Sequence, residues 1–468
     1  MRLVRNGIAR LSATRTGSNR WLALFVLAVI VMFFKGMSLL ALASEIAAGY
    51  AAKQICSGVF VARLPEHYVV EKDVLPRLAT VGPLAQLLDY ELDAREKSVS
   101  ARMLGQQVTV RYHAGYGCTL LPEGTQTLSA EPSFAVPATA DVSGSPVAPI
   151  MTALKFQSVL DSAFAEPATG GRNTLAVVVM HRGELVAERY SEPVTAETPL
   201  QGWSMNKSLM ATFIGRQLDQ GLLNLDDSVL EALERAGASG ESVARVDTRL
   251  TLQHLLSMTS GFDFSERYFP GDDVTDMLYR KPAMWLSAPQ TGHAYSPGEQ
   301  FAYSSGDINT ASVMWQQSLA GQPYVEWVEE HFSAPLKLQE IILEPDASGV
   351  QVGSSYAYLT ARDWAYMGQL WLDAWHGRSG LISQRWQRLA VTPGTAIQGE
   401  IYGLGFWLNT RHQAFPSAPE SAFYAGGNSG QFVVVIPEKE LVVVRLGLTL
   451  DESRAHMDAV LDDVLTIL

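Results

Sequence analysis

The sequence predicts an α+β fold in which an antiparallel sheet is flanked by helices, with a helical insert between its two halves. Two apolar hairpins carry this prediction: residues 174–190, which turn at 181–183, and residues 431–448, which turn at 437–440. Apolar runs bounded by turn residues are typical of paired strands. A sheet assembled from both ends of one domain explains why the residues between the two hairpins are mostly helical and loop-rich in pattern. A terminal helix is expected over about residues 453–468.

Composition limits the function classes. The chain has 468 residues, of which 47% are hydrophobic and 18% are charged, and its formal net charge is −13. This length supports a sizeable core and more than one average domain. The acidic balance argues against nucleic acid as a partner, because phosphate binding needs clustered Lys and Arg. No metal or organic cofactor is implied, and the oligomeric state is left open.

The first 43 residues differ from all that follow. Residues 1–20 carry five arginines and no acidic residue, and residues 21–43 are apolar apart from a few positions such as Lys35. This pattern predicts a basic cytoplasmic tail and a transmembrane anchor in the inner membrane, with the rest of the chain in the periplasm or cell exterior. The alternative is a cleaved secretory signal that ends at Ala41-Leu42-Ala43.

A small lobe is expected over residues 50–130. Strand-like runs at 59–62 and 107–113 flank a helical stretch around 84–102. A linker or strap is expected at 131–154, because residues 125–149 are rich in Ser, Thr, Ala, Pro and Gly.

The chain has two cysteines, Cys56 and Cys118, and both fall in this lobe. Neither has a partner at metal-ligand spacing. An exported chain can keep a disulfide, so we expect one between them. Two unrelated buried thiols are the alternative.

Ser204 and Lys207 form a Ser-x-x-Lys at the start of a predicted amphipathic helix that ends near Gly221. Residues three apart share a helix face, so the Lys207 amine can reach the Ser204 hydroxyl, and the helix N-terminus adds free N–H groups and partial positive charge. This is a candidate activated nucleophile. The alternative is an ordinary surface helix start, since the isolated motif also occurs by chance.

Two weaker elements follow downstream. Tyr303 lies in a short loop after the turn at Pro297-Gly298 and before a helix expected near Asn309, and a phenol beside an amine can relay a proton. Residues 424–431 form a Gly-rich approach to an apolar strand, where a strand-edge N–H can face a developing oxyanion. Taken alone, the first is a packing tyrosine and the second a simple turn.

In combination, the order Ser-x-x-Lys, Tyr-x-Ser and Gly-rich strand resembles the serine beta-lactamase-related family. More narrowly, the chain resembles the branch that contains class C beta-lactamase-like esterases, D-amino peptidases and 6-aminohexanoate-dimer hydrolase. Residues 250–261 and 353–364 are similar to further segments of that family. The resemblance covers residues 155–468 and implies the beta-lactamase/transpeptidase-like fold.

The resemblance also implies roles for individual residues. Ser204 would be the acylated nucleophile, Lys207 the general base, and Tyr303 the group that passes a proton to the leaving group. The N–H groups of Ser204 and Gln431 would form the oxyanion hole. The positions expected to contact the substrate are Ser305, Asn428, Ser429 and Gly430.

Two departures from the family pattern bear on specificity. The family's Tyr-x-Asn reads Tyr303-Ser304-Ser305, and its Lys-Thr-Gly reads Asn428-Ser429-Gly430. Loss of that lysine removes the cation that would favour a substrate carboxylate, which argues against beta-lactam hydrolysis. We therefore expect a serine hydrolase that cleaves a small-molecule amide or ester through an acyl-serine. The alternatives are a beta-lactamase or D,D-peptidase and a non-catalytic binding or sensor protein on the same fold.

Overall fold

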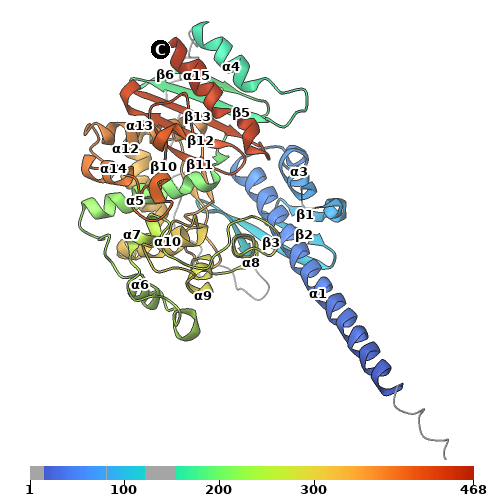
Figure 1. Ribbon diagram of the computed structural model, residues 1–468. Coiled ribbons are helices and arrows are strands. Elements are labelled where there is room, and N and C mark those ends of the chain that lie inside the picture. Colours follow the sequence, from blue (N-terminus) through green and yellow to red (C-terminus); the bar gives the residue numbers. More distant parts are fainter. Residues whose placement is uncertain (1–14, 81, 122–153) are drawn as a thin grey trace, which may run out of the picture.

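The computed structural model describes residues 15–80, 82–121 and 154–468 (Figure 1). The expected linker at 131–154 lies outside these residues except for Leu154, as does most of the basic tail at 1–20. The described chain consists of a long N-terminal helix, a small lobe that is built around it, and a larger body that contains a six-stranded sheet.

The six-stranded sheet is antiparallel and joins the two ends of the body. Its strand order is β10-β11-β12-β13-β5-β6. The pairing of β13 with β5, which sets Val443 opposite Val179, brings the two predicted hairpins side by side. This confirms the sheet expected from sequence. The strands are β5 (Thr174–His181), β6 (Glu184–Tyr190), β10 (Trp407–Leu408), β11 (Phe423–Gly427), β12 (Gln431–Ile436) and β13 (Leu441–Gly447).

Both faces of this sheet are covered by helices, which is why its central strands are apolar throughout. Alternate strand residues point to opposite faces. Val177 and Val443 pack in one cluster with α4 (Gln157–Phe164) and α15 (Met457–Ile467). Val178 and Val444 pack in the main core on the other face, which contains residues of α5 (Asn206–Asp219) and α13 (Ala361–Trp375). The expected terminal helix is thus α15.

The insert between the hairpins is largely helical, as expected. Helix α10 begins at Ser305, four residues before the expected Asn309, because the Ser304 side chain caps it by accepting a hydrogen bond from the Asp307 N–H (3.0 Å). A small sheet of order β7-β9-β8 lies beside these helices. The elements are α6 (Val229–Arg235), α7 (Leu252–Leu256), α8 (Asp273–Arg280), α9 (Ser287–Thr291), α10 (Ser305–Ser318), α11 (Tyr324–Val328), α12 (Ala334–Leu336), α14 (Gln384–Ala390), β7 (Leu200–Gln201), β8 (Ile342–Leu343) and β9 (Ala357–Leu359).

The small lobe packs a four-stranded antiparallel meander against the N-terminal helix. Its elements are α1 (Arg15–Cys56), α2 (Glu66–Val69), α3 (Leu75–Ala79), β1 (Asp89–Asp93), β2 (Ser98–Met103), β3 (Gln106–His113) and β4 (Gly117–Leu121). The strand expected at 107–113 is β3. The helix expected around 84–102 is wrong for most of that stretch, because β1 and β2 form from residue 89 onward and only Pro83–Leu87 is a 3₁₀ helix. At the turn between the two strands, the Asp93 carboxylate accepts two backbone N–H groups. The strand expected at 59–62 is also wrong, since Ser57–Val61 continues α1 as a π-helical turn.

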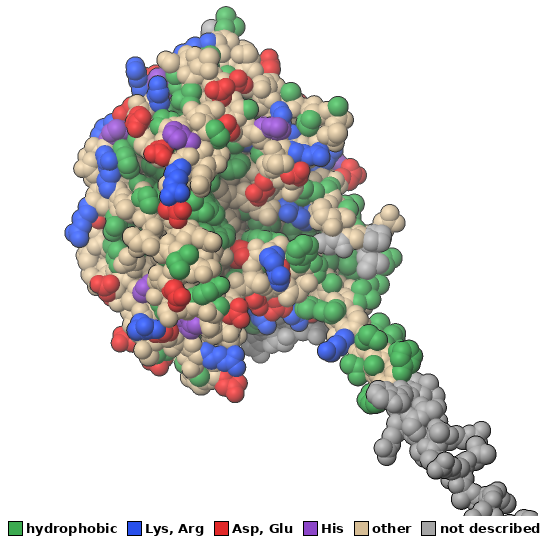
Figure 2. Space-filling view, in the orientation of Figure 1, with side chains coloured by type: hydrophobic (Ala, Val, Ile, Leu, Met, Phe, Trp, Pro, Cys, Tyr) green, Lys and Arg blue, Asp and Glu red, His purple; other side chains and the backbone are tan. Residues whose placement is uncertain are grey.

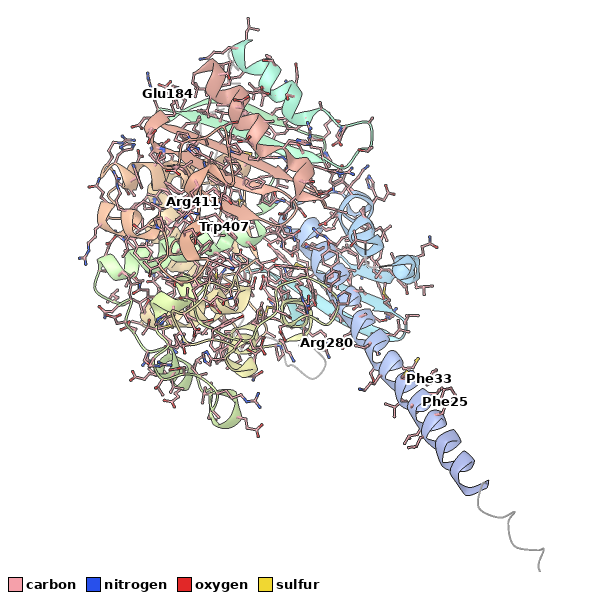
Figure 3. The ribbon with its side chains drawn as sticks, in the orientation of Figure 1. Phe25, Phe33, Glu184, Arg280, Trp407 and Arg411 are labelled. Carbon is pink, nitrogen blue, oxygen red and sulfur yellow. A yellow bond between two sulfur atoms is a disulfide. The ribbon has the colours of Figure 1, made fainter. Side chains whose placement is uncertain are left out.

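Helix α1 has two distinct parts. Its N-terminal part projects from the body with exposed apolar side chains, among them Phe25 (67% exposed) and Phe33 (62%), which point away from the body (Figure 3). From Ser44 onward its side chains are mostly buried in the small lobe. The segment Leu27–Val61 is long and apolar enough to cross a membrane.

Two buried contacts tie α1 to the rest of the chain. The sulfurs of Cys56 and Cys118 lie 1.97 Å apart, which joins the end of α1 to β4 as a disulfide. The Lys53 ammonium forms a fully buried ion pair with Glu344 of the body, and Ser57 donates to the same carboxylate (2.8 Å). Removing one member of such a pair would leave a buried charge without a partner, at a cost of about 3–5 kcal/mol.

Candidate active site

Ser204 lies in a single 3₁₀ turn, Trp203–Met205, that leads directly into α5. The preceding residue, Trp203, has a left-handed backbone (φ 48°), which is a strained conformation for a bulky side chain. Its indole is buried in the core that the small lobe shares with the body. Packing in that core therefore holds the turn that presents Ser204.

The Lys207 amine is buried at the centre of the site. It donates to the Ser204 hydroxyl (3.0 Å), the Ser305 hydroxyl (3.0 Å) and the Ser354 carbonyl (3.1 Å). These three acceptors use all three of its hydrogens. Burial lowers the pKa of Lys207 to about 8, against the opposing influence of the Glu266 and Asp307 carboxylates. A group with this pKa can gain and lose a proton near neutral pH.

Tyr303 lies beside the same amine, with the Lys207 nitrogen 4.7 Å from its ring centroid. Its ring stacks on Trp407 at 5.1 Å and meets Tyr402 edge-on at 6.0 Å. Burial raises the pKa of Tyr303 well above its ordinary value, while a hydrogen bond with Ser204 acts in the opposite direction. The phenol therefore carries its proton at neutral pH. The structure thus brings Ser204, Lys207 and Tyr303 together.

A carboxylate that sequence reasoning missed completes this cluster. Glu266 accepts hydrogen bonds from the Ser305 hydroxyl (2.5 Å) and the Ser305 N–H (2.8 Å). Burial raises the pKa of Glu266, whereas Lys207 lowers it. Ser305 is fully buried and linked to both charged groups, so its geometry fits positioning of Lys207 and not the substrate contact expected from sequence. Glu266 is a single acidic residue in a loop, and no spacing relates it to the Ser-x-x-Lys.

The strand residue beside the nucleophile is Gly427, at the end of β11. A Cβ atom at Gly427 would lie 2.2 Å from the Gly202 carbonyl oxygen and 3.2 Å from the Ser204 nitrogen. Only glycine permits this close approach. On its outer side, among the described residues, β11 pairs with β10 only at Phe423 and Tyr424, so its last residues form an open strand edge.

Gln431, the residue expected at this place, lies one strand further from the nucleophile. It is paired opposite Gly427 on β12. Its side chain binds the backbone of Gly447 through both amide atoms, at 2.6 and 3.0 Å. The expectation that the Gln431 N–H lies beside the nucleophile is therefore corrected, because the chain turns back through residues 428–430 before it reaches Gln431.

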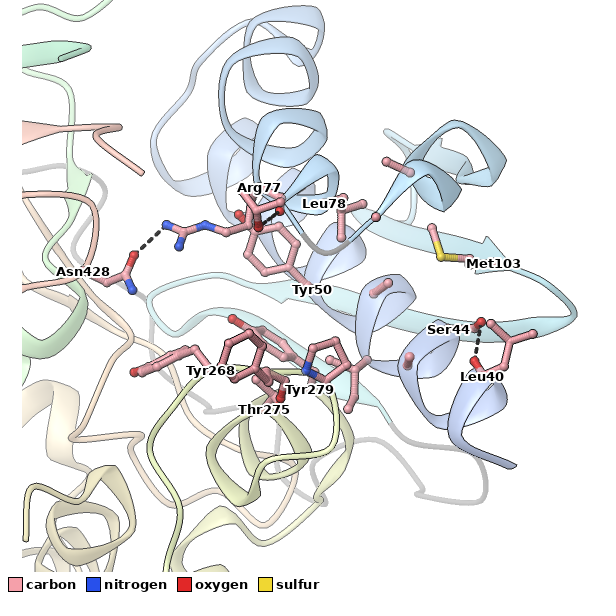
Figure 4. Close-up of a pocket in the computed structure, with 18 of the residues that line it drawn as sticks. Leu40, Ser44, Tyr50, Arg77, Leu78, Met103, Tyr268, Thr275, Tyr279 and Asn428 are labelled. Atoms are coloured by element: carbon pink, nitrogen blue, oxygen red, sulfur yellow. Dashed lines mark hydrogen bonds between the residues drawn. The ribbon is translucent and has the colours of Figure 1, made fainter. Parts of the chain in front are cut away.

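The loop of residues 428–430 receives a cation from the small lobe. The Arg77 guanidinium, on α3, donates to the Asn428 side-chain oxygen (2.6 Å) and to the Ser429 hydroxyl (2.5 Å) (Figure 4). The buried Arg445 fixes the far end of the loop by donating to the Gly430 carbonyl (2.6 Å). The chain lacks the family's lysine at position 428, but a guanidinium from a residue 351 positions away reaches the same loop.

Within the residues that the structure describes, no group of three or more His, Cys, Asp or Glu side chains is arranged to hold a metal ion. The groups that the described site offers for chemistry are a serine hydroxyl, a lysine amine of lowered pKa, a protonated phenol, and backbone N–H groups at a strand edge.

The close approach of Gly427 yields a stability prediction. Gly427→Ala would drive a methyl group into the Gly202 backbone, so the free energy of unfolding should fall by about 1–3 kcal/mol. Gly426→Ala is the matched control, because its added atom would come no closer than 3.2 Å, to the Tyr424 ring, and should change stability by less than about 1 kcal/mol. Urea unfolding of the two variants measures the difference. Equal stabilities would contradict the placement of Gly427 against the nucleophile turn.

Comparisons with known proteins show the family of the larger body. The Beta-lactamase family model matches residues 160–465. The 6-aminohexanoate-dimer hydrolase of Paenarthrobacter ureafaciens is 25% identical over 307 residues, which are 60% of this chain and 74% of that protein.

Two solved structures share the fold. A penicillin-binding protein homologue from Caulobacter crescentus has a TM-score of 0.52 at 16% identity, covering 67% of this chain and 97% of its own. A family VIII carboxylesterase has a TM-score of 0.53 at 16% identity, covering 68% and 98%. The body of this protein therefore has the beta-lactamase/transpeptidase-like fold, and the chain belongs to the Beta-lactamase family of serine hydrolases.

Proposed function

We propose that this protein is a serine hydrolase that cleaves a small-molecule amide or ester through an acyl-enzyme on Ser204. The observation that carries the proposal is the buried Lys207 amine, which lies 3.0 Å from the Ser204 hydroxyl and has a pKa lowered to about 8. A neutral amine at this distance can accept the hydroxyl proton as the oxygen attacks. The similarity to an amide hydrolase and an esterase supports the same reaction class.

The proposed reaction has two halves. The Ser204 oxygen attacks the substrate carbonyl carbon while Lys207 takes its proton, and the negative charge moves to the carbonyl oxygen. The backbone N–H groups of Ser204 and Gly427 would stabilise that oxyanion. Tyr303 then donates its proton to the leaving alcohol or amine as the bond breaks, and is reprotonated from Lys207. Water hydrolyses the acyl-serine by the reverse proton path, which releases a carboxylic acid and restores Ser204.

Glu266 and Ser305 are proposed as positioning residues. Ser305 joins the Glu266 carboxylate to the Lys207 amine, so the amine stays aimed at Ser204 in both protonation states. The carboxylate also stabilises the ammonium that forms during attack.

We also propose that α1 anchors the protein in the inner membrane, with the body in the periplasm or cell exterior. The support is its exposed apolar stretch, from Leu24 to Leu40, and the arginines that precede it in sequence.

A second candidate has specific support. Arg77 places a guanidinium beside the strand loop, where it could hold a substrate carboxylate as beta-lactams and D,D-peptidase substrates would require. A non-catalytic binding or sensor role is the remaining alternative, and it predicts no turnover of any ester or amide.

The nucleophile is tested by substitution. Ser204→Ala should lower kcat/KM for an aryl ester by at least about a thousandfold, because Ser305, the other hydroxyl that meets the Lys207 amine among the described residues, is fully buried and cannot replace Ser204. Ser208→Ala is the matched control: Ser208 lies on α5, the helix that follows the nucleophile turn, and its hydroxyl donates to the Gly405 carbonyl and not to a proposed catalytic group, so the activity of this variant should stay close to wild type. Steady-state hydrolysis distinguishes the two. Equal loss in both variants, or no loss in Ser204→Ala, would refute the assignment.

The lowered pKa of Lys207 predicts the pH dependence. Only the neutral amine can accept a proton, so kcat/KM for an uncharged ester should rise with pH and level off above about 8. Lys207→Arg keeps the charge but stays protonated at all accessible pH values, so its activity should be lower by about a hundredfold or more. A wild-type profile that is flat between about pH 6 and 9 would contradict the role of Lys207 as base.

A further inference from the structure

A pocket of about 350 Å³ extends from the nucleophile turn along helix α1, outside the cluster of Ser204, Lys207 and Tyr303 (Figure 4). This volume is within the range of small-molecule binding sites. The walls come from α1, α3, α8 and the loop before α8. The lining residues include Leu40, Ala43, Ser44, Ala47, Tyr50 and Leu78, with Met103, Thr275 and Tyr279 facing them.

One face of α1 forms the floor of this pocket. Leu40, Ala43, Ala47 and Tyr50 recur at spacings of three and four residues, so they lie in one stripe along the helix. Ten residues of helix make this stripe about 15 Å long. Small side chains at 43, 44 and 47 leave the space open. The pocket is therefore elongated, with its long direction along α1.

Three of the hydroxyl groups in these walls already have hydrogen-bond partners. The Ser44 hydroxyl donates to the Leu40 carbonyl (2.7 Å), the Thr275 hydroxyl to the Phe269 carbonyl (2.8 Å), and the Tyr50 hydroxyl to the Asp73 carboxylate (2.9 Å). A polar ligand would find few partners along this length and would lose its contacts with water. An apolar chain has no hydrogen bonds with water to lose, so it would bind without this cost.

The two ends of the pocket differ. At the outer end Leu40 is 37% exposed and Phe269 is 66% exposed, where α1 leaves the body toward its apolar exposed part. On the face that Figure 2 shows, hydrophobic side chains lie beside the helix at this exit. The inner end is formed by Trp203, which directly precedes the nucleophile, together with Arg77 and Asn428. The pocket thus runs from the exposed part of α1 to the residue that directly precedes the nucleophile.

We propose that this pocket binds the hydrocarbon chain of a membrane amphiphile whose ester or amide group is cleaved at Ser204. The chain would lie along the α1 stripe, its polar end would meet Arg77 and Ser204, and the substrate would enter from the bilayer in which the same helix is embedded. The inference rests on the proposed hydrolase function and narrows its substrate class to long-chain amphiphiles.

Chain-length selectivity tests the proposal, with the full-length protein reconstituted in phospholipid vesicles. Referred to the total ester concentration, each methylene that leaves water for the bilayer and then the pocket should raise the apparent affinity by about fourfold. The share that the pocket supplies is the share that the pocket-filling variants described next remove. Phenyl laurate should then exceed phenyl acetate, or dodecyl acetate should exceed ethyl acetate, by about a hundredfold or more in kcat/KM. The first pair applies if the chain is on the acyl side, and the second if it is on the alcohol side. Turnover of all four esters without a preference in either pair would overturn the inference and leave the hydrolase function intact.

Filling the pocket should abolish the preference. Ala47→Phe places a ring in the middle of the stripe and should lower the long-chain to short-chain ratio of kcat/KM by about tenfold or more. If Ala47→Phe does not fold, Ala43→Phe replaces it. Ala43 is half-buried and nearer the outer end of the pocket, and its substitution should lower the same ratio. Ala41→Phe is the matched control, because Ala41 is on the same helix but does not line the pocket. A ratio that falls equally in the control would contradict the proposal.

A binding experiment separates this inference from the hydrolase proposal. Ser204→Ala protein in vesicles would be irradiated with a photoreactive dodecanoic acid, and the labelled peptides mapped by mass spectrometry. Labels on pocket residues that disappear in the Ser204→Ala, Ala47→Phe double variant support the pocket even if no ester is turned over. Labels confined to the exposed stretch from Leu24 to Leu39 would overturn it.

Discussion

The burial of the Lys207 amine is the constraint on which this site depends. An ammonium removed from water is costly unless it is fully hydrogen-bonded, and its three acceptors come from three separate parts of the chain: the nucleophile turn, the start of α10 and the loop before β9. The pairing of β7 with β9 holds the first and third of these together, because Gln201 lies opposite Tyr358 shortly before Ser204. The same burial lowers the pKa of Lys207 to about 8, so one structural requirement both assembles the site and makes the amine a usable base.

The small lobe belongs to the site as well as to the anchor. The Trp203 indole is packed in the lobe's core, which holds a strained backbone directly before Ser204. Arg77 reaches from the lobe to the strand loop, and the buried Lys53 and Glu344 pair locks α1 onto the body. Both charged groups of this pair are fully buried, so each relies on the other to stay ionised. Helix α1 therefore places its apolar exposed part in a fixed relation to the nucleophile, which a flexible tether would not do.

The sequence could predict those features that local pattern controls. Alternating and continuous apolar runs give both hairpins of the six-stranded sheet, and the spacing of Ser204 and Lys207 gives their contact on one helical turn. Sequence pattern does not predict those features that depend on contacts between distant segments of the chain. Within residues 84–102, strands β1 and β2 form because β3 pairs with β2 and α1 covers the sheet. The partner of Asn428 is Arg77, and no motif relates the positions of these two residues. The sequence indicates Gln431 and not Gly427 as the strand residue beside the nucleophile. The reason is that the hairpin register decides at which glycine the strand ends, and local pattern does not determine this register.

In the proposed reaction, the Ser204 oxygen forms a covalent bond with the acyl group of the substrate. The most direct measurement is intact-mass and peptide-mapping analysis of the full-length protein after treatment with a fluorophosphonate, which phosphonylates an activated serine with loss of fluoride. A single adduct is expected on the peptide that contains Ser204, and it should form faster as Lys207 loses its proton when the pH is raised toward about 8 and beyond. An adduct on another serine, or ester hydrolysis that continues while Ser204 remains unmodified, would contradict it.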